Sequence, residues 1–390
     1  MVTLKASSLL AAEDAGARVL PDEFVSAFSR LAESLDGEAD LTLVGRRLIQ
    51  NQLLRIVRQR RSLEQQEIRP WEVEPRIVVI VGLPRTGTTL LHHLIAHCCE
   101  TDFVPLWEAL EPFVVAGAPH SPSRPLRADH YLRFIDRLSP QLRKLHPMGV
   151  DTPDECDVAL QLSALSDWFA IAHRCHSYSR WAEREPRAQS LAVYRRLLTA
   201  IRPHAGSLVL KSPSHLAHLG DLFATFSRCR VIWLHRPRRE VVPSFVRLVH
   251  AARAVTCDPG SFSAIRREWL PRLEARIEAG SPWLDDQRVL NVHYDDLLHD
   301  TAGTLTSISA FSGLLPRSNG PTPTAIAEQL RSAMAGRNGH SPSRDLDVGP
   351  ETDLWLSRAV TRRARPIGAG DSRRAARPWP ARPHPQRSAR

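Results

Sequence analysis

Residues 77–91 read IVVIVGLPRTGTTLL and indicate the architecture of the whole chain. The run from Ile77 to Val81 is apolar and β-branched throughout, as in a parallel strand that is buried on both faces. The next six residues form a turn with glycine at each end, where a positive φ costs little. Apolar residues at 90, 91, 94 and 95 then have helical spacing. Strand, glycine turn and helix N-terminus together predict a cradle of backbone N–H groups that binds an anion.

The spacing of residues 82–89 matches the nucleotide-binding P-loop GxxxxGK[ST] at every fixed position except one. Gly82, Gly87 and Thr89 fit the pattern, but Thr88 stands where the lysine is required. An ATPase or GTPase needs that lysine for the β- and γ-phosphates. In this chain Arg85 brings a cation into the turn instead. The loop is therefore expected to hold a phosphate group, but not the triphosphate of a standard NTPase.

Three segments resemble the family of sulfotransferases that use 3′-phosphoadenosine 5′-phosphosulfate (PAPS). GLPRTGTT resembles the family's 5′-phosphosulfate loop, and residues 208–245 resemble its second strand, linking helix and 3′-phosphate-binding strand, loop and helix. HPMGVDTPDEC, residues 146–156, resembles a segment typical of the bacterial, mycobacterial-type branch. The resemblance implies in-line transfer of a sulfuryl group from PAPS to a hydroxyl of a small-molecule or lipid acceptor, with PAPS as co-substrate and no metal.

The resemblance also implies which residues hold PAPS. Arg236 and Ser244 have the same separation as the family's arginine and serine that bind the 3′-phosphate. The family often has His-Arg-Asp-Pro at this place, whereas residues 235–238 read His-Arg-Pro-Arg, which makes the turn more basic. Arg337, in the sequence Arg-Asn-Gly, is the candidate for the family's C-terminal Arg-x-Gly loop. The predicted cofactor-binding residues are Gly82, Pro84, Arg85, Thr86, Gly87, Thr88, Thr89, Arg236, Ser244 and Arg337.

Four residues are predicted to carry the chemistry. Lys211 ends a predicted strand, at the carboxyl edge where open α/β sheets bind ligands. By resemblance, Lys211 faces the sulfuryl group and Arg85 contacts the phosphosulfate. His215 is a candidate general base, which the neighbouring cations Lys211 and Arg85 are expected to keep neutral. Because part of the family uses a carboxylate, Glu155 is the rival base, and the two alternatives stay open.

The chain is predicted to have an α/β fold: a P-loop-like parallel sheet with helices on both faces, plus an N-terminal helical extension. The predicted domains are the extension at 1–70, the sulfotransferase domain at 71–316, and a poorly ordered C-terminal region with an Arg/Pro-rich tail at 317–390. Residues 102–150 are expected to be loop-rich because they contain seven prolines. Predicted strands are 76–81, 207–211, 229–235 and 288–293; predicted helices include 88–98, 215–227, 239–254, 262–279 and 302–312.

Composition narrows the function classes further. No apolar run reaches the roughly 18 residues of a membrane span, and the N-terminus does not resemble a secretory signal, so a cytoplasmic protein is expected. Most of the net charge of +10 lies in the last 30 residues, which gives no support to a specific nucleic-acid-binding face. The six cysteines have no metal-ligand spacing and are expected to be reduced, buried thiols.

Two rival functions remain open at this point. One is a degenerate sulfotransferase that binds 3′,5′-nucleotides without turnover. The other is a P-loop kinase or NTPase, which needs a lysine at position 88 and a magnesium-binding aspartate at the end of a strand.

Overall fold

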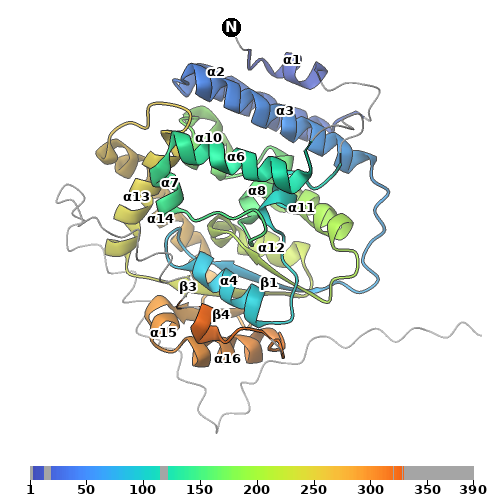
Figure 1. Cartoon of the computed structure of the whole chain (residues 1–390), viewed down its shortest axis with the longest axis vertical. Coiled ribbons are helices and arrows are strands. Elements are labelled where there is room, and N and C mark those ends of the chain that lie inside the picture. The colour runs from blue at the N-terminus through green and yellow to red at the C-terminus, as the bar shows by residue number, and fades with distance from the viewer. Residues whose placement is uncertain (1–2, 13–18, 115–121, 319, 327, 329–390) are drawn as a thin grey trace, which may run out of the picture.

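A four-stranded parallel sheet forms the centre of the protein, in the strand order β2-β1-β3-β4 (Figure 1). The computed structural model describes residues 3–12, 19–114, 122–318, 320–326 and 328. The strands are β1 (Arg76–Val81), β2 (Ser207–Lys211), β3 (Cys229–His235) and β4 (Val289–His293). Since all four run parallel, the residues that follow them gather at one edge of the sheet.

Both faces of the sheet are covered, which confirms the predicted α/β fold. In β1, Ile77, Val79 and Val81 contribute to one hydrophobic core, whereas Val78 and Ile80 contribute to another. Side chains alternate between the two faces of a strand, and both faces of β1 are buried. Every residue from 77 to 81 is therefore apolar and β-branched, as the sequence shows. The helices of this part are α4 (Thr88–Cys98), α12 (Leu219–Thr225), α13 (Arg238–Arg253), α14 (Phe262–Gly280), α15 (Tyr294–His299) and α16 (Thr301–Ser312). Short 3₁₀ helices occupy Pro213–His218 (η2) and Ser281–Trp283 (η3).

The predicted N-terminal extension is helical in the structure. It consists of α1 (Ala6–Ala11), α2 (Asp22–Glu38) and α3 (Leu43–Gln65), which lie along one end of the molecule in Figure 1. Phe24 and Phe28 of α2 share a core with Phe169 and Tyr178, which come from the insertion between β1 and β2. The extension is thereby packed against the α/β unit through a large apolar interface. The division of the chain into three domains stays a prediction.

The long insertion between β1 and β2 differs from the expectation. Residues 102–150 were expected to be loop-rich, but they contain a 15-residue helix, α6 (Arg124–Leu138). Pro125 lies in the first turn of α6 and Pro140 in the first turn of α7, where a helix needs no N–H donor. These prolines therefore begin helices rather than break them. The insertion contains α5 (Leu106–Leu110), α6, α7 (Pro140–Leu145), α8 (Cys156–Leu160), η1 (Gln161–Ser163), α9 (Trp168–Ala172), α10 (His176–Ala182) and α11 (Ala188–Ile201).

The described residues beyond α16 pack back onto the sheet's covering helix. Arg317 donates its backbone N–H to the carbonyl of Cys98 at 2.8 Å, and the Ile326 side chain is buried in the core that α4 shares. Arg337 and the rest of the predicted Arg-x-Gly loop lie outside the described residues. Within the described part of the chain, no helix is long and apolar enough to cross a membrane. All six cysteines are unpaired and buried, as predicted.

Candidate active site

The loop from Gly82 to Gly87 needs both of its glycines. Gly82 has φ +149°, and a Cβ there would lie 2.5 Å from the carbonyl oxygen of Leu234. Gly87 has φ +99°, and a Cβ there would lie 2.5 Å from the ring of Tyr294. Both positions therefore combine a backbone conformation that disfavours side chains with a lack of space for one. This close approach of β1, β3 and α15 fixes the loop at the carboxyl edge of the sheet.

The loop opens directly into the N-terminus of α4. Gly87 is the cap residue, so no side chain accepts a hydrogen bond from the first free amides of this helix. Within the loop, the Thr86 hydroxyl donates to the Leu83 carbonyl at 2.8 Å and holds the turn closed. Pro84 and Thr88 are buried and Thr89 is half-buried beside these amides. A helix N-terminus of this kind attracts a phosphate or sulfate group.

Arg85 projects from the tip of this loop with an unusual backbone conformation. Its φ is +75°, which costs free energy for a non-glycine residue and occurs mostly at functional sites. The guanidinium donates from Nε to the Ser244 hydroxyl at 3.0 Å and from Nη1 to the Leu145 carbonyl at 2.6 Å. Burial, followed by the neighbouring Arg236, lowers the pKa of Arg85 to about 10, so the side chain is still charged at neutral pH.

Arg236, which follows β3, is held next to the same loop. Its Nη1 donates to the Arg85 carbonyl at 3.2 Å, and its Nε donates to the Glu240 carboxylate at 2.9 Å. The guanidinium carbon also lies 4.2 Å from the centre of the Tyr294 ring. The structure thus brings together the predicted residues Arg85, Arg236 and Ser244 as one connected group of donors.

Lys211 and Glu155 form an ion pair at the same edge of the sheet. Lys211 is the last residue of β2 and only 1% exposed, and its Nζ donates to Glu155 Oε1 at 2.7 Å. Burial raises the pKa of Glu155, but Lys211, His146 and Arg85 outweigh burial and leave the pKa below its ordinary value. Glu155 is therefore an ionised carboxylate that is held between cations at neutral pH.

A buried carboxylate positions Glu155 against β2. Asp157, two residues along, accepts hydrogen bonds from the hydroxyls of Ser212 and Ser214 in the turn after Lys211. Burial, with Asp167 and Glu155 nearby, raises the pKa of Asp157. This contact ties the start of α8 to the end of β2, so Glu155 stays within reach of Lys211.

His215 occupies a different environment from the other predicted site residues. Its ring is 3% exposed, and its Nε2 is buried without a hydrogen-bond partner. Burial lowers the pKa of His215 to about 3, and the charged groups that act on it are His218, Arg187 and Asp167. The expectation that Lys211 and Arg85 keep His215 neutral is wrong in its cause, because neither cation is among the groups that shift the pKa of His215. Burial keeps the imidazole neutral instead.

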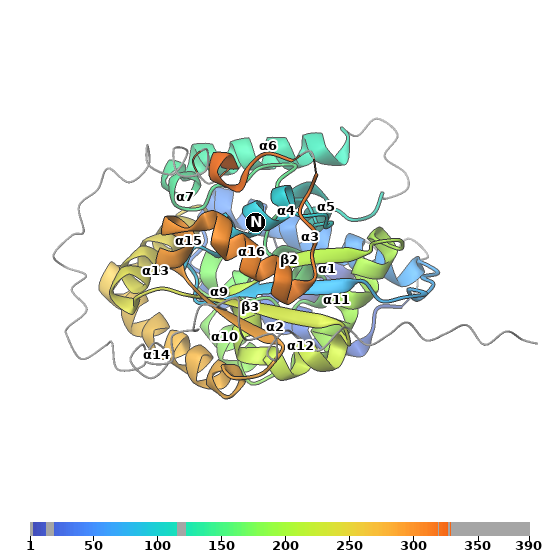
Figure 2. The same cartoon turned by 90° about the horizontal axis from the view of Figure 1, so that it is seen from below.

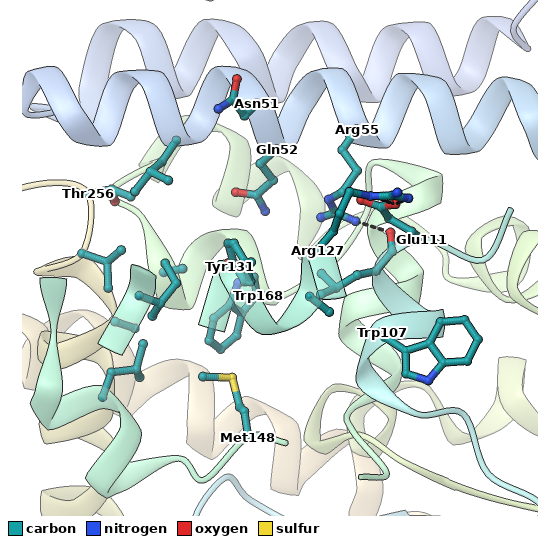
Figure 3. A pocket seen from close by; sticks show the side chains of 18 of the residues that line it. Asn51, Gln52, Arg55, Trp107, Glu111, Arg127, Tyr131, Met148, Trp168 and Thr256 are labelled. Carbon is teal, nitrogen blue, oxygen red and sulfur yellow. Dashed lines mark hydrogen bonds and ion pairs between the residues drawn. The ribbon is translucent and has the colours of Figure 1, made fainter. Parts of the chain in front are cut away.

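An apolar cavity of about 370 Å³ lies between α3, α6 and α9 (Figure 3). Arg55 and Gln52 extend from α3 on one side, and Tyr131, Trp168 and Met148 face them from the other (Figure 3). The apolar lining is Leu48, Leu110, Ala128, Ile135, Leu142, Met148, Trp168, Ala172, Ala252 and Val255. Burial of this much apolar lining suits a ligand with an apolar body.

The arginines that line the cavity are engaged with neighbouring groups. Arg127 donates from Nε to the Glu111 carboxylate at 2.9 Å, and Arg124 lies 4.8 Å from the centre of the Trp107 ring. Arg55 donates to the side-chain oxygen of Gln161 at 3.1 Å. These arginines therefore shape the wall of the cavity more than they offer free charge to a ligand.

His146 lies between the wall of the cavity and the Lys211–Glu155 ion pair. Trp168 lines the cavity, and its ring is tilted against that of His146 with 6.3 Å between the ring centres. Burial lowers the pKa of His146, while Glu155 and Asp154 raise it, so this imidazole stands beside the ion pair. His146 therefore connects the Trp168 wall of the cavity to the Lys211–Glu155 pair.

The P-loop kinase or NTPase interpretation gains no support from the strand ends. β1, β2, β3 and β4 end at Val81, Lys211, His235 and His293, so none of the four described strands ends in the aspartate that a magnesium nucleotide requires. Among the described residues, no group of three or more His, Cys, Asp and Glu side chains is arranged to hold a metal ion.

A sulfotransferase family model matches residues 75–315, and the chain therefore belongs to the sulfotransferase family. Two curated relatives are the omega-hydroxy-beta-dihydromenaquinone-9 sulfotransferases Stf3 of Mycobacterium bovis and Mycobacterium tuberculosis. Each is 25% identical over 258 residues, which cover 61% of this chain. The match spans 62% of the length of these relatives.

Solved structures agree with this assignment. Sulfotransferase STF1 from Mycobacterium tuberculosis H37Rv is 25% identical, with a TM-score of 0.66 over 91% of this chain and 98% of that one. Sulfotransferase STF9 from Mycobacterium avium shares the fold, with a TM-score of 0.71 at 16% identity over 93% of this chain and 96% of that one. The predicted resemblance to mycobacterial-type sulfotransferases and the predicted P-loop-like fold are both confirmed.

Sequence reasoning missed four residues that shape the site. Tyr294 supports Arg236 and abuts Gly87, and its position just after a predicted strand was a signal for it. Glu240 pairs with Arg236 at the i, i+4 spacing of a helix, which the sequence also contains. His146 and Asp157 lie in and just beyond the segment 146–156, but only the fold shows which side chains of that segment point toward Lys211.

Proposed function

We propose that the protein transfers a sulfuryl group from PAPS to a hydroxyl of an acceptor that occupies the apolar cavity. The observation that carries this proposal is the Lys211–Glu155 ion pair at 2.7 Å, at the same sheet edge as the Gly82–Gly87 loop. A cation beside an anion-binding loop stabilises charge on a transferring group, and a carboxylate at the end of a cavity takes a proton. Few other reactions require this combination without a strand-end aspartate.

The residues present fit PAPS. The uncapped N-terminus of α4 and the glycine loop suit the 5′-phosphosulfate, because the amides at the start of this helix have no side-chain cap and Gly82 and Gly87 allow the loop to pack against Leu234 and Tyr294. Arg236 and Ser244 suit the 3′-phosphate, since an arginine offers two parallel donors to phosphate oxygens. Glu240 accepts a hydrogen bond from Arg236 and thereby orients the guanidinium. When bound, PAPS supplies the sulfuryl group, and adenosine 3′,5′-bisphosphate is the other product.

We assign the general base to Glu155 rather than to His215. Glu155 is ionised, touches Lys211 and lies next to His146 at the end of the cavity. His215 is neutral but faces Asp167, Arg187 and His218. In the proposed reaction Glu155 accepts the acceptor's hydroxyl proton while that oxygen bonds to sulfur and the sulfur–oxygen bond to the bisphosphate breaks. Lys211 and Arg85 stabilise the negative charge that develops on the leaving oxygen.

We infer that the acceptor is a lipid or another largely apolar hydroxyl compound. The cavity is apolar along most of its wall, and Arg127 and Arg55 in that wall are already paired with Glu111 and Gln161. The curated relatives act on a hydroxylated menaquinone, as their name states, and such a molecule joins a hydroxyl to an apolar body. A cytoplasmic location is part of this proposal, because six unpaired buried cysteines suit a reducing compartment.

Calorimetry with nucleotides tests the proposal. Adenosine 3′,5′-bisphosphate should bind without metal, and much more tightly than AMP or ATP with or without Mg²⁺. Arg236→Ala should weaken binding of the bisphosphate but leave binding of AMP nearly unchanged. Equal affinity for AMP and the bisphosphate would refute the assignment of the 3′-phosphate to Arg236 and Ser244.

A further inference from the structure

We propose that the surface around the mouth of the cavity docks on a membrane that contains anionic phospholipids, from which a lipid acceptor enters the cavity. This inference rests on the proposed function, since the docking surface serves an acceptor that resides in a bilayer. The surface, called the rim below, consists of the exposed residues of α3, α6 and α7. In Figure 1, α6 lies below α3, and α7 packs against α6.

The exposed lining residues locate the mouth of the cavity. Most side chains that line the cavity are buried or half-buried, but Asn51 and Arg58 of α3 and Tyr131 of α6 are exposed. The mouth therefore opens between α3 and α6. Trp168, which also lines the cavity, contacts His146, and His146 lies near Glu155. An acceptor that enters with its hydroxyl first would leave its tail between α3 and α6, at the rim.

Large apolar side chains are exposed on the rim. Leu43 at the start of α3 is 86% exposed and Val44 is 48% exposed, while Phe134 of α6 is 40% exposed. Phe134 follows Tyr131 by one helical turn and is not part of the cavity wall. Single exposed apolar residues are ordinary, but a group of them beside the mouth of an apolar cavity marks an interaction surface.

The same helices are strongly basic. The exposed basic residues of the rim are Arg47 and Arg58 of α3, Arg133 and Arg137 of α6, and Arg143 and Lys144 of α7, whereas Asp129 and Asp136 of α6 are half-buried. Both aspartates are already paired, Asp129 with Arg133 and Asp136 with Arg143. Arg137 and Lys144 are exposed and have no side-chain partner in the described part of the chain. The rim is thus basic in a chain whose other excess positive charge lies mainly in its last 30 residues.

Basic and apolar side chains together match an anionic membrane surface. Arginine and lysine are attracted to anionic headgroups, and leucine, valine and phenylalanine enter the boundary between headgroups and acyl chains. A nucleic acid or an acidic protein would use the charges but leave the apolar residues without a role. Since the described helices include none that spans a membrane, the contact would be peripheral.

A fluorescent label on the rim tests this inference in the full chain. All six native cysteines are buried, so an environment-sensitive thiol label on Phe134→Cys reports this site alone. Vesicles of phosphatidylcholine with phosphatidylglycerol should shift its emission to the blue, whereas vesicles of pure phosphatidylcholine should not. The matched control is Val73→Cys, 48% exposed and remote from the rim. Leu43→Cys, at the most exposed rim position, provides a second label site should Phe134→Cys fail to fold.

Charge variants complete the test. The double variant Arg137→Gln with Lys144→Gln should need about 25-fold more vesicles for the half-maximal emission shift. Each basic residue near an anionic surface increases the affinity for the membrane about fivefold. Arg184→Gln with Arg267→Gln removes the same charge elsewhere and should change little. Arg267 lies on α14, on the side of the molecule opposite α6 (Figure 2). Neither pair should alter transfer to a short, water-soluble acceptor.

The outcomes separate this inference from the proposed function. No shift at both Phe134→Cys and Leu43→Cys would overturn it, even if the arginine-rich C-terminal residues carry the protein to vesicles. Equal shifts at residues 134 and 73, or equal effects of the two charge pairs, would also overturn it, since both indicate non-specific adsorption. A shift restricted to the rim supports docking whether or not the protein turns over PAPS, because the label does not report catalysis.

Discussion

The nucleotide edge of the sheet and the acceptor cavity are built from the chain in opposite ways. The nucleotide edge uses residues that directly follow strands, namely the Gly82–Gly87 loop, Lys211 and Arg236. Its shape depends on the backbone, and its donors are polar. The cavity uses side chains from six helices between residues 48 and 256, and its wall is mostly apolar. Reaction type is thus encoded locally at the edge, whereas acceptor choice depends on distant helices that meet only after folding.

The largest expected effect tests whether Glu155 connects the two regions. Glu155→Gln should lower kcat by about 10²–10⁴, because an amide cannot accept the acceptor's proton. His215→Gln is the matched control and should keep kcat within a few-fold of the wild type. Binding of adenosine 3′,5′-bisphosphate, measured by calorimetry, should survive both substitutions. An inactive His215→Gln beside an active Glu155→Gln would move the base to His215.

A second prediction separates catalysis from binding within the nucleotide edge. Arg85→Ala should lower kcat by roughly 10²–10³, since it removes a charge-assisted donor that stabilises the leaving oxygen. Arg236→Ala removes a contact made equally in the ground and transition states, so it should mainly raise the KM for PAPS. Steady-state kinetics with both variants checks this division. A change in KM alone for Arg85→Ala would show that its role is binding.

The Arg85–Ser244 hydrogen bond links the predicted catalytic arginine to the predicted 3′-phosphate site, and the coupling between these two residues can be measured. Ser244 was assigned to the 3′-phosphate and Arg85 to the 5′-phosphosulfate, yet their side chains are bonded at 3.0 Å. The double variant Arg85→Ala with Ser244→Ala should therefore affect the KM for PAPS by less than the product of the single effects. Multiplicative effects would indicate that the two residues act independently.

The sequence predicted the nucleotide edge well because strand, turn and helix signals are contiguous there. Gly82, Gly87, Lys211 and Arg236 follow buried runs whose ends are visible in the sequence, and parallel strands must gather those ends at one edge. The orientation of His215 was beyond this reasoning, because η2 replaces the first turn of the predicted helix. α6 was missed because Pro125, which lies in its first turn, was interpreted as a loop signal. The cavity was invisible, since its wall has no sequence motif.

A fourth prediction concerns the acceptor cavity alone. Leu48→Trp should fill part of the cavity and raise the KM for an apolar acceptor by roughly tenfold or more, since small misfits in apolar pockets have effects of this size. Affinity for the bisphosphate should not change, because Leu48 does not contact the nucleotide edge. Leu48→Ile keeps the volume of the side chain and serves as the control. Loss of bisphosphate binding in Leu48→Trp would mean that the two regions are coupled.

The smallest expected effect addresses the residue that belongs to neither region. The pKa of His215 is about 3 in the folded protein, because burial disfavours its charged form, but about 6.5 in an unfolded chain. The unfolded state therefore binds a proton below pH 6.5 that the native state refuses until about pH 3, so the native state loses stability as the pH falls through this window. His215→Gln removes the group that binds this proton in the unfolded state. As the pH falls below 6, the free energy of unfolding of the variant should therefore decrease less steeply than that of the wild type, by up to about 1.4 kcal/mol per pH unit. Urea unfolding at pH 7, 6 and 5 measures the two slopes, and parallel slopes would show that His215 is protonated in the folded protein and exposed enough to act as a base.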